Sequence, residues 1–183
     1  KGKGRIWGIE PNPLTFAYLK KNVRVNDYKN IELINIAISD KKGKMPFYMS
    51  KNWNCSRFEK GPDDSDIIQI KEVKIDSLDN LFANKKVDFI RMDVEGYEFN
   101  ILKGATKVIG NNPGIKIYFE FHAQFFNTKQ REELIEFLKK NKLKIKYMFL
   151  GEDMNPKPFS KSYKDLRNAP FTTHYLLLEK DRA

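Results

Sequence analysis

Residues Val87–Glu98, VDFIRMDVEGYE, decide how this chain folds. The apolar half of the stretch has the composition of a strand covered on both faces, and Gly96 permits a tight turn from that strand into a helix. Apolar residues then recur at helical spacing from about Tyr97. In an open parallel α/β sheet, ligands bind beyond the carboxyl ends of the strands, which is where Asp93 falls. The stretch therefore predicts a buried strand that delivers Asp93 to a site.

Two further acids in the stretch have two interpretations. Glu95 and Glu98 fall in the first turn of the predicted helix, near the positive end of its dipole. They either stabilise the helix start alone or join Asp93 at the site. Asp93 itself calls for a partner, because an unpaired carboxylate at a strand end is costly to bury.

Composition places the chain among globular proteins. Its 183 residues, 40% hydrophobic and 32% charged, predict one domain, 1–183, with a core of its own. The sequence has no run of about 18 apolar residues and no apolar centre of a signal peptide near its start. The single cysteine, Cys55, excludes an internal disulfide framework and fits a reducing compartment. We therefore expect a cytoplasmic protein without a membrane partner, and leave its oligomeric state open.

The net charge of +10 comes from 34 Lys and Arg against 24 Asp and Glu. The lysines are spread along the chain and form no dense tail. A basic surface raises the rate of encounter with phosphates and anionic glycans, but the same pattern also fits an ordinary solvated surface. Nucleic acid is thus a possible partner that the charge does not favour.

Strands and helices alternate along the chain, which predicts βαβ units and a mostly parallel sheet. The last two strands have no helix pattern between them and predict an antiparallel hairpin. Thr128 is expected to cap the helix that it begins. Polar segments 51–66 and 152–170 are candidate lids or substrate loops. Strands are expected at 5–9, 31–38, 45–49, 67–75, 87–92, 115–121, 143–150 and 174–179, and helices from 13, from about 76, from 97 and at 128–140.

Polar residues follow the first two predicted strands as well as the central one. Glu10 follows the first strand, and Ser39 and Asp40 follow the second. A carboxylate at such a strand end can accept both hydrogen bonds of a ribose diol, which makes Glu10 a candidate for binding a nucleoside. The alternative is a simple exposed turn, since Pro11 and Pro13 follow so closely.

Four segments in this order and spacing resemble the FkbM family of S-adenosylmethionine-dependent methyltransferases. They are GRIWGIEPNPLTFAYLKKNVRVN at 4–26, AISD at 37–40, IDSLDNL at 75–81 and VDFIRMDVEGYEFNILKGA at 87–105. The resemblance extends to about Glu120. It implies a class I methyltransferase fold, a Rossmann-like three-layer sandwich with an antiparallel final strand. It also implies methyl transfer from S-adenosyl-L-methionine to a hydroxyl of a sugar, glycan or other small molecule.

The resemblance also implies roles for individual residues. Glu10, with Asn12 beside it, would bind the ribose of the cofactor, and Asp93 would lie near the methionine end and the transferring methyl. The adenine pocket would be lined by Ala37, Ile38 and Ser39. Enzymes of this kind begin with a strand and a glycine-rich turn that are absent from this sequence, so we expect it to start after that strand, with an incomplete cofactor site.

Methyl transfer from a sulfonium is an in-line displacement that also needs the acceptor proton to be removed or shared. Asp93 is the first choice for that task, and Glu95 and His122 are further catalytic candidates. Glu120 is expected to contact the acceptor. His122 has an alternative role as a structural hydrogen-bonding residue. These four residues could also form an oxygen-rich metal site, but no metal-binding spacing is present, and we expect no metal.

Trp53 and Asn54 are the other expected acceptor-binding residues, because an aromatic ring among amides can stack on a sugar face. Trp53 could equally anchor its own loop. Two alternative functions remain. An RNA 2′-hydroxyl methyltransferase is suggested by the net charge and by lysines such as Lys103 and Lys116, and a non-catalytic cofactor-binding or scaffold domain by the absent glycine-rich turn.

Overall fold

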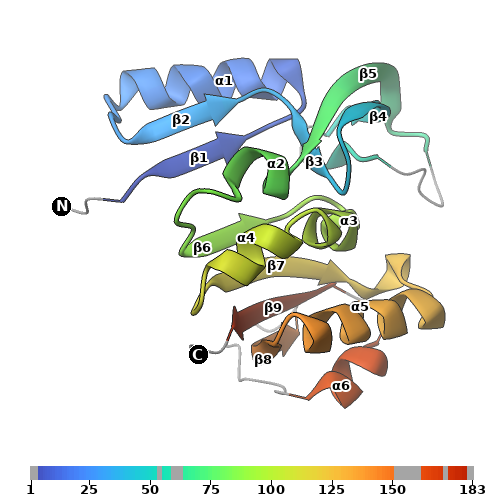
Figure 1. Ribbon diagram of the computed structural model, residues 1–183. Helices are drawn as coiled ribbons and strands as arrows, with labels where there is room; N and C mark the ends of the chain where they lie inside the picture. The colour runs from blue at the N-terminus through green and yellow to red at the C-terminus, as the bar shows by residue number, and fades with distance from the viewer. Residues whose placement is uncertain (1–3, 53–54, 59–63, 151–161, 171–172, 181–183) are drawn as a thin grey trace. The chain divides into compact units, whose positions relative to one another are not determined.

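The computed structural model describes residues 4–52, 55–58, 64–150, 162–170 and 173–180 (Figure 1). The chain divides into two compact units, an N-terminal unit, Lys1–Ser77, and a C-terminal unit, Leu78–Ala183. The expectation of a single domain over 1–183 stays a prediction.

The N-terminal unit opens with a βαβ arrangement. β1 (Ile6–Ile9) pairs in parallel with β2 (Ile31–Ile34), and α1 (Pro13–Val25) runs alongside the pair (Figure 1). The helix begins at Pro13 because the side chain of Asn12 accepts a hydrogen bond from Leu14 N at 3.0 Å, which satisfies a backbone donor that the helix leaves open.

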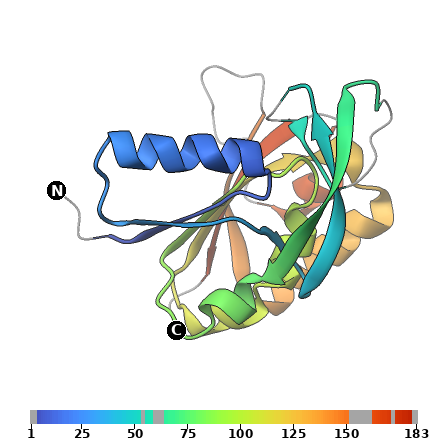
Figure 2. The same ribbon diagram turned by 90° about the horizontal axis from the view of Figure 1, so that it is seen from above.

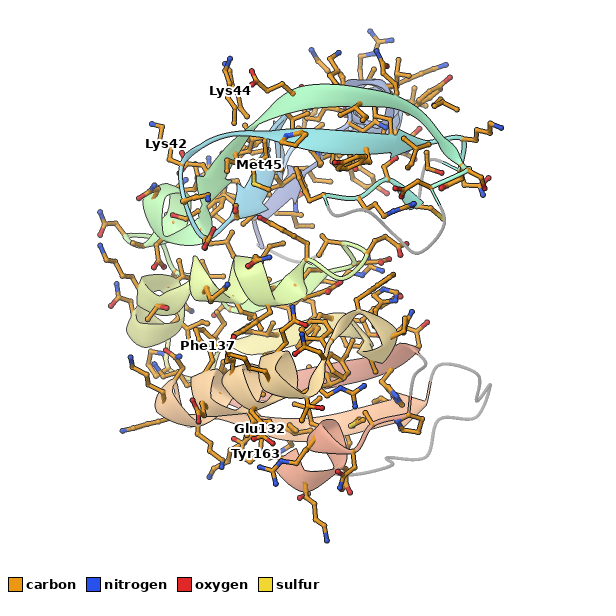
Figure 3. All side chains as sticks on the ribbon, turned by 90° about the vertical axis from the view of Figure 1, so that its right-hand side faces the viewer. Lys42, Lys44, Met45, Glu132, Phe137 and Tyr163 are labelled. Carbon is orange, nitrogen blue, oxygen red and sulfur yellow. The ribbon has the colours of Figure 1, made fainter. Side chains whose placement is uncertain are left out.

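A second sheet completes the N-terminal unit. β5 (Ile67–Ser77) lies between β3 (Ala37–Ser39), to which it is parallel, and β4 (Gly43–Ser50), to which it is antiparallel. Side chains alternate along β4: Met45 packs against the core, while Lys44 pairs with Glu72 at 2.8 Å in solvent (Figure 3). The core of this sheet consists of Ala37, Phe47, Met49, Val73 and Ile75.

The C-terminal unit is built on one four-stranded sheet in the order β6-β7-β9-β8. β6 and β7 are parallel, whereas β9 is antiparallel to both of its neighbours, β7 and β8. Its elements are α2 (Leu78–Phe82), β6 (Phe89–Met92), α3 (Glu98–Lys103), α4 (Thr106–Asn111), β7 (Lys116–His122), the 3-10 helix η2 (Ala123–Phe125), α5 (Thr128–Lys140), β8 (Leu143–Leu150), α6 (Tyr163–Arg167) and β9 (Thr173–Lys180).

The core of the C-terminal unit lies between one face of this sheet and the helices. Ile117, Phe119 and Phe121 of β7 alternate onto that face and are fully buried. α3, α4 and α5 cover the same face (Figures 1 and 2). α6 packs on α5, where Arg167 donates to Glu132 at 3.0 Å; Figure 3 labels Glu132 beside Tyr163 of α6.

Several expectations from the sequence need correction. The predicted mostly parallel sheet is wrong for the described residues, because three of the six strand pairings are antiparallel and the sheets are mixed. The predicted strand at 31–38 is two strands in different sheets, and α6 lies inside the predicted loop 152–170. The C-terminal antiparallel hairpin is confirmed as β8 and β9.

The cap of α5 is a further correction. Thr128 is the first helical residue, and Asn127 is the cap: its side chain accepts from Gln130 N while the Gln130 side chain accepts from Asn127 N, both at 2.9 Å.

No helix in the described part of the chain is both long enough and apolar enough to cross a membrane.

Candidate functional site

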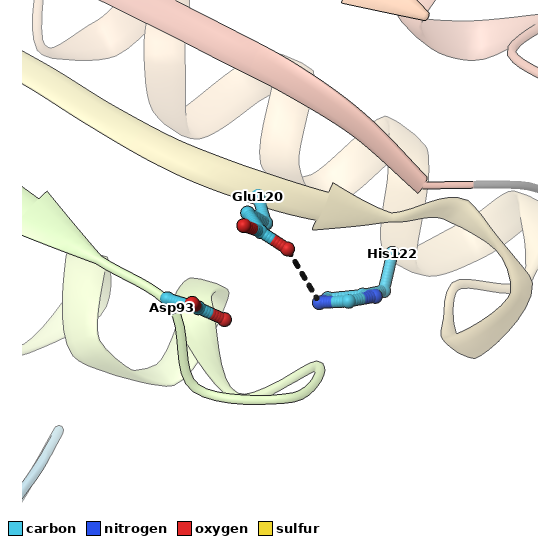
Figure 4. A group of neighbouring side chains, drawn as sticks. All are labelled: Asp93, Glu120 and His122. Carbon is cyan, nitrogen blue, oxygen red and sulfur yellow. Dashed lines mark ion pairs between the residues drawn. The ribbon is translucent and has the colours of Figure 1, made fainter. Parts of the chain in front are cut away.

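Three side chains with acid–base or metal-binding groups meet at the carboxyl ends of β6 and β7. Asp93 directly follows β6, and Glu120 and His122 belong to the end of β7. One ligand atom from each lies within 4.8 Å of the others. Figure 4 shows the three side chains pointing toward one another. We refer to Asp93, Glu120 and His122 as the strand-end cluster.

The parallel register of the two strands creates this cluster. Met92 of β6 is paired with Phe119 of β7, and both are buried against the helices. Because side chains alternate along a strand, the next residues, Asp93 and Glu120, point to the opposite face side by side. His122 lies two residues beyond Glu120 and returns to the same face.

The two carboxylates of the cluster have different charged partners. Arg91 Nη2 donates to Asp93 Oδ2 at 3.3 Å, and His122 Nε2 lies 3.7 Å from Glu120 Oε2. Burial is the main cause that raises the pKa of Glu120, and the negative charge of Asp93 raises it further, against the opposing effects of His122 and Arg91. Glu120 is therefore a better proton acceptor than an exposed carboxylate, while Asp93 has a cationic partner.

A fourth carboxyl, Glu98, lies next to the cluster in sequence and is fully buried. Its Oε1 accepts hydrogen bonds from the backbone N–H groups of Val94 and Gly96, each at 3.3 Å, which fixes the turn after Asp93. Burial raises the pKa of Glu98 to about 7, the backbone hydrogen bonds oppose this shift, and the charge of Asp93 adds to it. Glu98 thus shapes the loop that carries Asp93.

The other predicted catalytic acid, Glu95, has a different position. It is half-buried in the turn, with a positive φ of 53°, and it is not one of the three clustered residues. Gly96 follows with φ of 93°, and a Cβ atom there would lie 2.8 Å from Cδ2 of Phe125. The turn is therefore tight, and the prediction of Glu95 as a catalytic residue gains no support from its position.

In the N-terminal unit, Glu10 directly follows β1 and is half-buried. Its carboxylate accepts a hydrogen bond from the backbone N–H of Asn12 at 2.7 Å. Burial raises the pKa of Glu10, and this hydrogen bond opposes the shift. The Asn12 side chain, which is buried, caps α1. Both residues are thus fixed at the strand-to-helix turn, and their binding of a ribose stays a prediction.

Three of the remaining predicted site residues belong to β3. Ala37, Ile38 and Ser39 make up β3 and are buried, and the Ser39 hydroxyl donates to Asp40 Oδ1 at 3.0 Å. Their contact with adenine stays a prediction. Trp53 and Asn54, like much of 51–66 and 152–170, lie outside the described residues.

Two residues next to the cluster were not predicted from the sequence. Arg91 lies two residues before Asp93, and Tyr118 lies two residues before Glu120, so strand alternation places each on the same face as the acid. Tyr118 also stacks on Tyr175 of β9, with ring centroids 6.1 Å apart and planes at 4°. The period of two, counted back from each acid, is the signal that would have identified both.

The chain was compared with a family model and with solved structures, which bear on its family and its fold respectively. Residues 1–145 match the family model described as "Methyltransferase FkbM domain". Among solved structures, the chain is similar to methyltransferase FkbM from Methylobacillus flagellatus KT, with 15% identity and a TM-score of 0.52 over 94% of this chain. The chain spans only 36% of the length of that protein. This likeness concerns the fold.

Two other solved structures are similar at lower scores. One is precorrin-6y C5,15-methyltransferase from Geobacter metallireducens GS-15, with 12% identity and a TM-score of 0.43 over 97% of this chain and 68% of the other. The second is TYW2 from M. jannaschii in complex with AdoMet, with 15% identity and a TM-score of 0.42 over 98% of this chain and 58% of the other. Among curated protein sequences, none matches significantly.

Proposed function

The chain belongs to the FkbM methyltransferase family, and from this premise we propose that it transfers a methyl group from S-adenosyl-L-methionine to a hydroxyl of a sugar, glycan or other hydroxylated small molecule. The observation that carries the proposal is the strand-end cluster. Two carboxylates and an imidazole within 4.8 Å of one another are suited to hold a hydroxyl and to accept its proton.

The proposed reaction exchanges one bond for another. The S–CH3 bond of the sulfonium breaks, an O–CH3 bond forms on the acceptor, and the sulfonium becomes a neutral thioether. The hydroxyl proton must leave as the new bond forms. Asp93 and Glu120 share the hydrogen bond donated by the single hydroxyl proton, which orients the acceptor oxygen. Glu120, whose pKa is raised by burial and by the charge of Asp93, receives the proton with His122 beside it.

Cofactor binding is proposed for the N-terminal unit through Glu10. A carboxylate accepts both hydrogen bonds of a ribose diol, and Glu10 is held at the end of β1 by its bond from Asn12 N. This assignment is supported by the family membership and by the position of Glu10.

Calorimetric titration with S-adenosylmethionine tests the cofactor. We expect the chain to bind it, and Glu10→Gln to weaken binding about 10- to 100-fold, because charge-assisted hydrogen bonds contribute roughly 1.5–3 kcal/mol. Glu72→Gln is the matched control, since Glu72 is an exposed acid of the same unit that pairs with Lys44. Equal binding by Glu10→Gln and the wild type would overturn the role of Glu10.

Transfer is tested by following S-adenosylhomocysteine formation with a panel of saccharides and other hydroxylated acceptors. Loss of a proton acceptor typically costs about 10²- to 10⁴-fold, so Glu120→Gln should lower kcat/KM by that order. Glu133→Gln, an exposed position on α5, should leave it unchanged. Equal activity of Glu120→Gln and the wild type would overturn the role of Glu120.

A further inference from the structure

The strand-end cluster has the composition of a metal site as well as of an acid–base site. It offers two carboxylate oxygens and one imidazole nitrogen within 4.8 Å of one another (Figure 4). Two of these donors come from the end of β7 and one from the residue directly after β6. The three donors are brought together by the register of β6 and β7, and not by a local run of acids in the sequence. The fold, therefore, creates the convergence.

The spacing between the imidazole and a carboxylate fits a shared ion. His122 Nε2 and Glu120 Oε2 are 3.7 Å apart, which is longer than a normal hydrogen bond of about 2.7–3.2 Å. Two ligand atoms at about 2.1 Å from one ion are separated by roughly 3.0 Å at a right angle and by roughly 3.4 Å at a tetrahedral angle. A small adjustment of either side chain would bring both into coordination distance.

Burial and charge favour a cation at this position. His122 is only 7% exposed, and Figure 4 shows its ring directed at Glu120. Asp93 and Glu120 carry like charges at close range, and among the described residues the one ionic partner of Asp93 is an exposed arginine, Arg91. A bound cation would offset the repulsion between the two carboxylates.

A second observation comes from the loop that presents Asp93. Glu98 is fully buried, and its Oε2 atom has no hydrogen-bond partner among the described residues. The charge of Asp93 acts on this carboxyl. Burying an acid without a full set of hydrogen-bond partners lowers the stability of the fold. Such a destabilising group beside a cluster of metal-type donors is typical of a functional site.

We propose that Asp93, Glu120 and His122 bind one divalent transition-metal ion such as Mn²⁺. Carboxylates suit Mn²⁺ and Mg²⁺, while the imidazole favours a transition metal over Mg²⁺. Three protein ligands leave coordination positions open, as in catalytic metal sites. The sequence alone predicted no metal, because the donors come from separate strands and have no diagnostic spacing.

The use of the ion in catalysis rests on the proposed function, whereas its binding does not. An acceptor oxygen at an open position would have a lowered pKa and would release its proton to water, while the same S–CH3 bond breaks and the O–CH3 bond forms. In this mode, Glu120 is a ligand of the ion, and transfer requires the metal. Direct proton transfer to Glu120 requires none.

The binding test uses Mn²⁺ alone with the whole chain, without cofactor or acceptor. We expect continuous-wave EPR to show one bound Mn²⁺ per chain, and pulsed EPR to show coupling to an imidazole nitrogen. The sequence has only two histidines, and the second, His174, faces the core beside Phe121. His122→Gln should abolish the nitrogen coupling and weaken Mn²⁺ binding at least tenfold.

Further variants keep the result interpretable. Asp93→Asn and Glu120→Gln should each weaken Mn²⁺ binding at least tenfold, so the test does not depend on the folding of His122→Gln. The control Glu133→Gln should bind Mn²⁺ like the wild type. Absence of Mn²⁺ binding by the folded wild type, or binding unchanged in these ligand variants, would overturn the proposal.

Assays of methyl transfer distinguish the proposed metal site from the proposed function. Transfer that is lost with EDTA and restored by Mn²⁺ supports a catalytic ion, and transfer that resists EDTA overturns that role. Mn²⁺ binding at the cluster without any methyl transfer would refute the proposed function and leave the metal site standing.

Discussion

Glu98 is a buried carboxyl whose pKa is raised far above its ordinary value. The side chain is fully buried, one of its oxygens accepts two backbone hydrogen bonds, and its pKa is raised to about 7, chiefly by burial. In the unfolded chain, the same carboxyl has an ordinary pKa of about 4.3. Folding therefore becomes linked to the protonation of this single group.

The linkage gives a stability change with a definite sign. Between about pH 4.3 and 7, the folded chain keeps the Glu98 proton that the unfolded chain has released, so the free energy of unfolding falls as pH rises. Glu98→Gln keeps the shape and removes the titration. We expect the stability of wild type relative to Glu98→Gln to fall by an amount on the order of 3 kcal/mol from pH 4 to pH 8.

Urea unfolding of both metal-free proteins at several pH values measures this difference, and comparison of the pair cancels the other titrating groups. Parallel stability curves over that range would contradict the raised pKa of Glu98.

The sequence predicted the role of a single residue only where that residue follows directly on the end of a strand. Asp93 was predicted correctly as the residue directly after a strand, but the expectation that this strand is covered on both faces was wrong, because Phe89 and Arg91 of β6 are exposed and only Met92 is buried. The burial of Glu98 was not predicted, although it has a helical spacing with Ile101, Leu102 and Ala105, all of which are buried. The charge of Glu98 concealed its membership of that buried face, because acids are almost never buried alone.

At the scale of elements, the turn between β6 and α3 decides how Asp93 is presented. Gly96 has φ of 93°, which other residues rarely adopt, and an added Cβ would lie 2.8 Å from Phe125 Cδ2. The two hydrogen bonds to Glu98 hold the same turn. Backbone conformation, packing and a buried acid therefore all fix this one segment.

Gly96→Ala should destabilise the fold by about 1–3 kcal/mol, because alanine is strained at this φ and Phe125 must move. Gly110→Ala is the matched control. Gly110 lies in α4 with nothing within 4 Å of the added Cβ, so alanine there should stabilise by up to about 1 kcal/mol. Urea midpoints of the two variants measure the contrast, and equal effects would mean that the turn is not constrained as described.

The sequence predicted the strands better than it predicted which strands pair with one another. The apolar run at 31–38 indicated a strand, but the chain divides it after Ile34, and Asn35 Nδ2 donates to Glu10 O at 2.8 Å. β2 then pairs with β1, and β3 pairs with β5. Local patterning reports which residues prefer extended backbone; it does not report which sheet a strand joins, because that depends on distant chain segments.

For the whole molecule, the net charge of +10 raises the question of an RNA partner. The lysines that suggested this partner do not gather at the strand-end cluster. Lys116 begins β7, four residues or about 13 Å of strand from Glu120. Lys103 is at the last residue of α3 and lies over the ring of Phe99 at 5.0 Å. From the net charge and these two positions we therefore expect a general attraction for polyanions, and not recognition of RNA.

General attraction predicts equal binding of RNA and DNA. Affinities for single-stranded RNA and DNA of the same length and sequence should agree within about twofold, and both should fall about 10- to 100-fold between roughly 50 and 200 mM salt. Fluorescence anisotropy titrations at several salt concentrations measure both slopes. The 2′-hydroxyl is what distinguishes RNA from DNA, so a preference for RNA that survives high salt would show that this group is read. That result would favour an RNA 2′-hydroxyl acceptor over a sugar or small molecule, because a polyanion bound only by charge gives the cluster no particular hydroxyl to methylate.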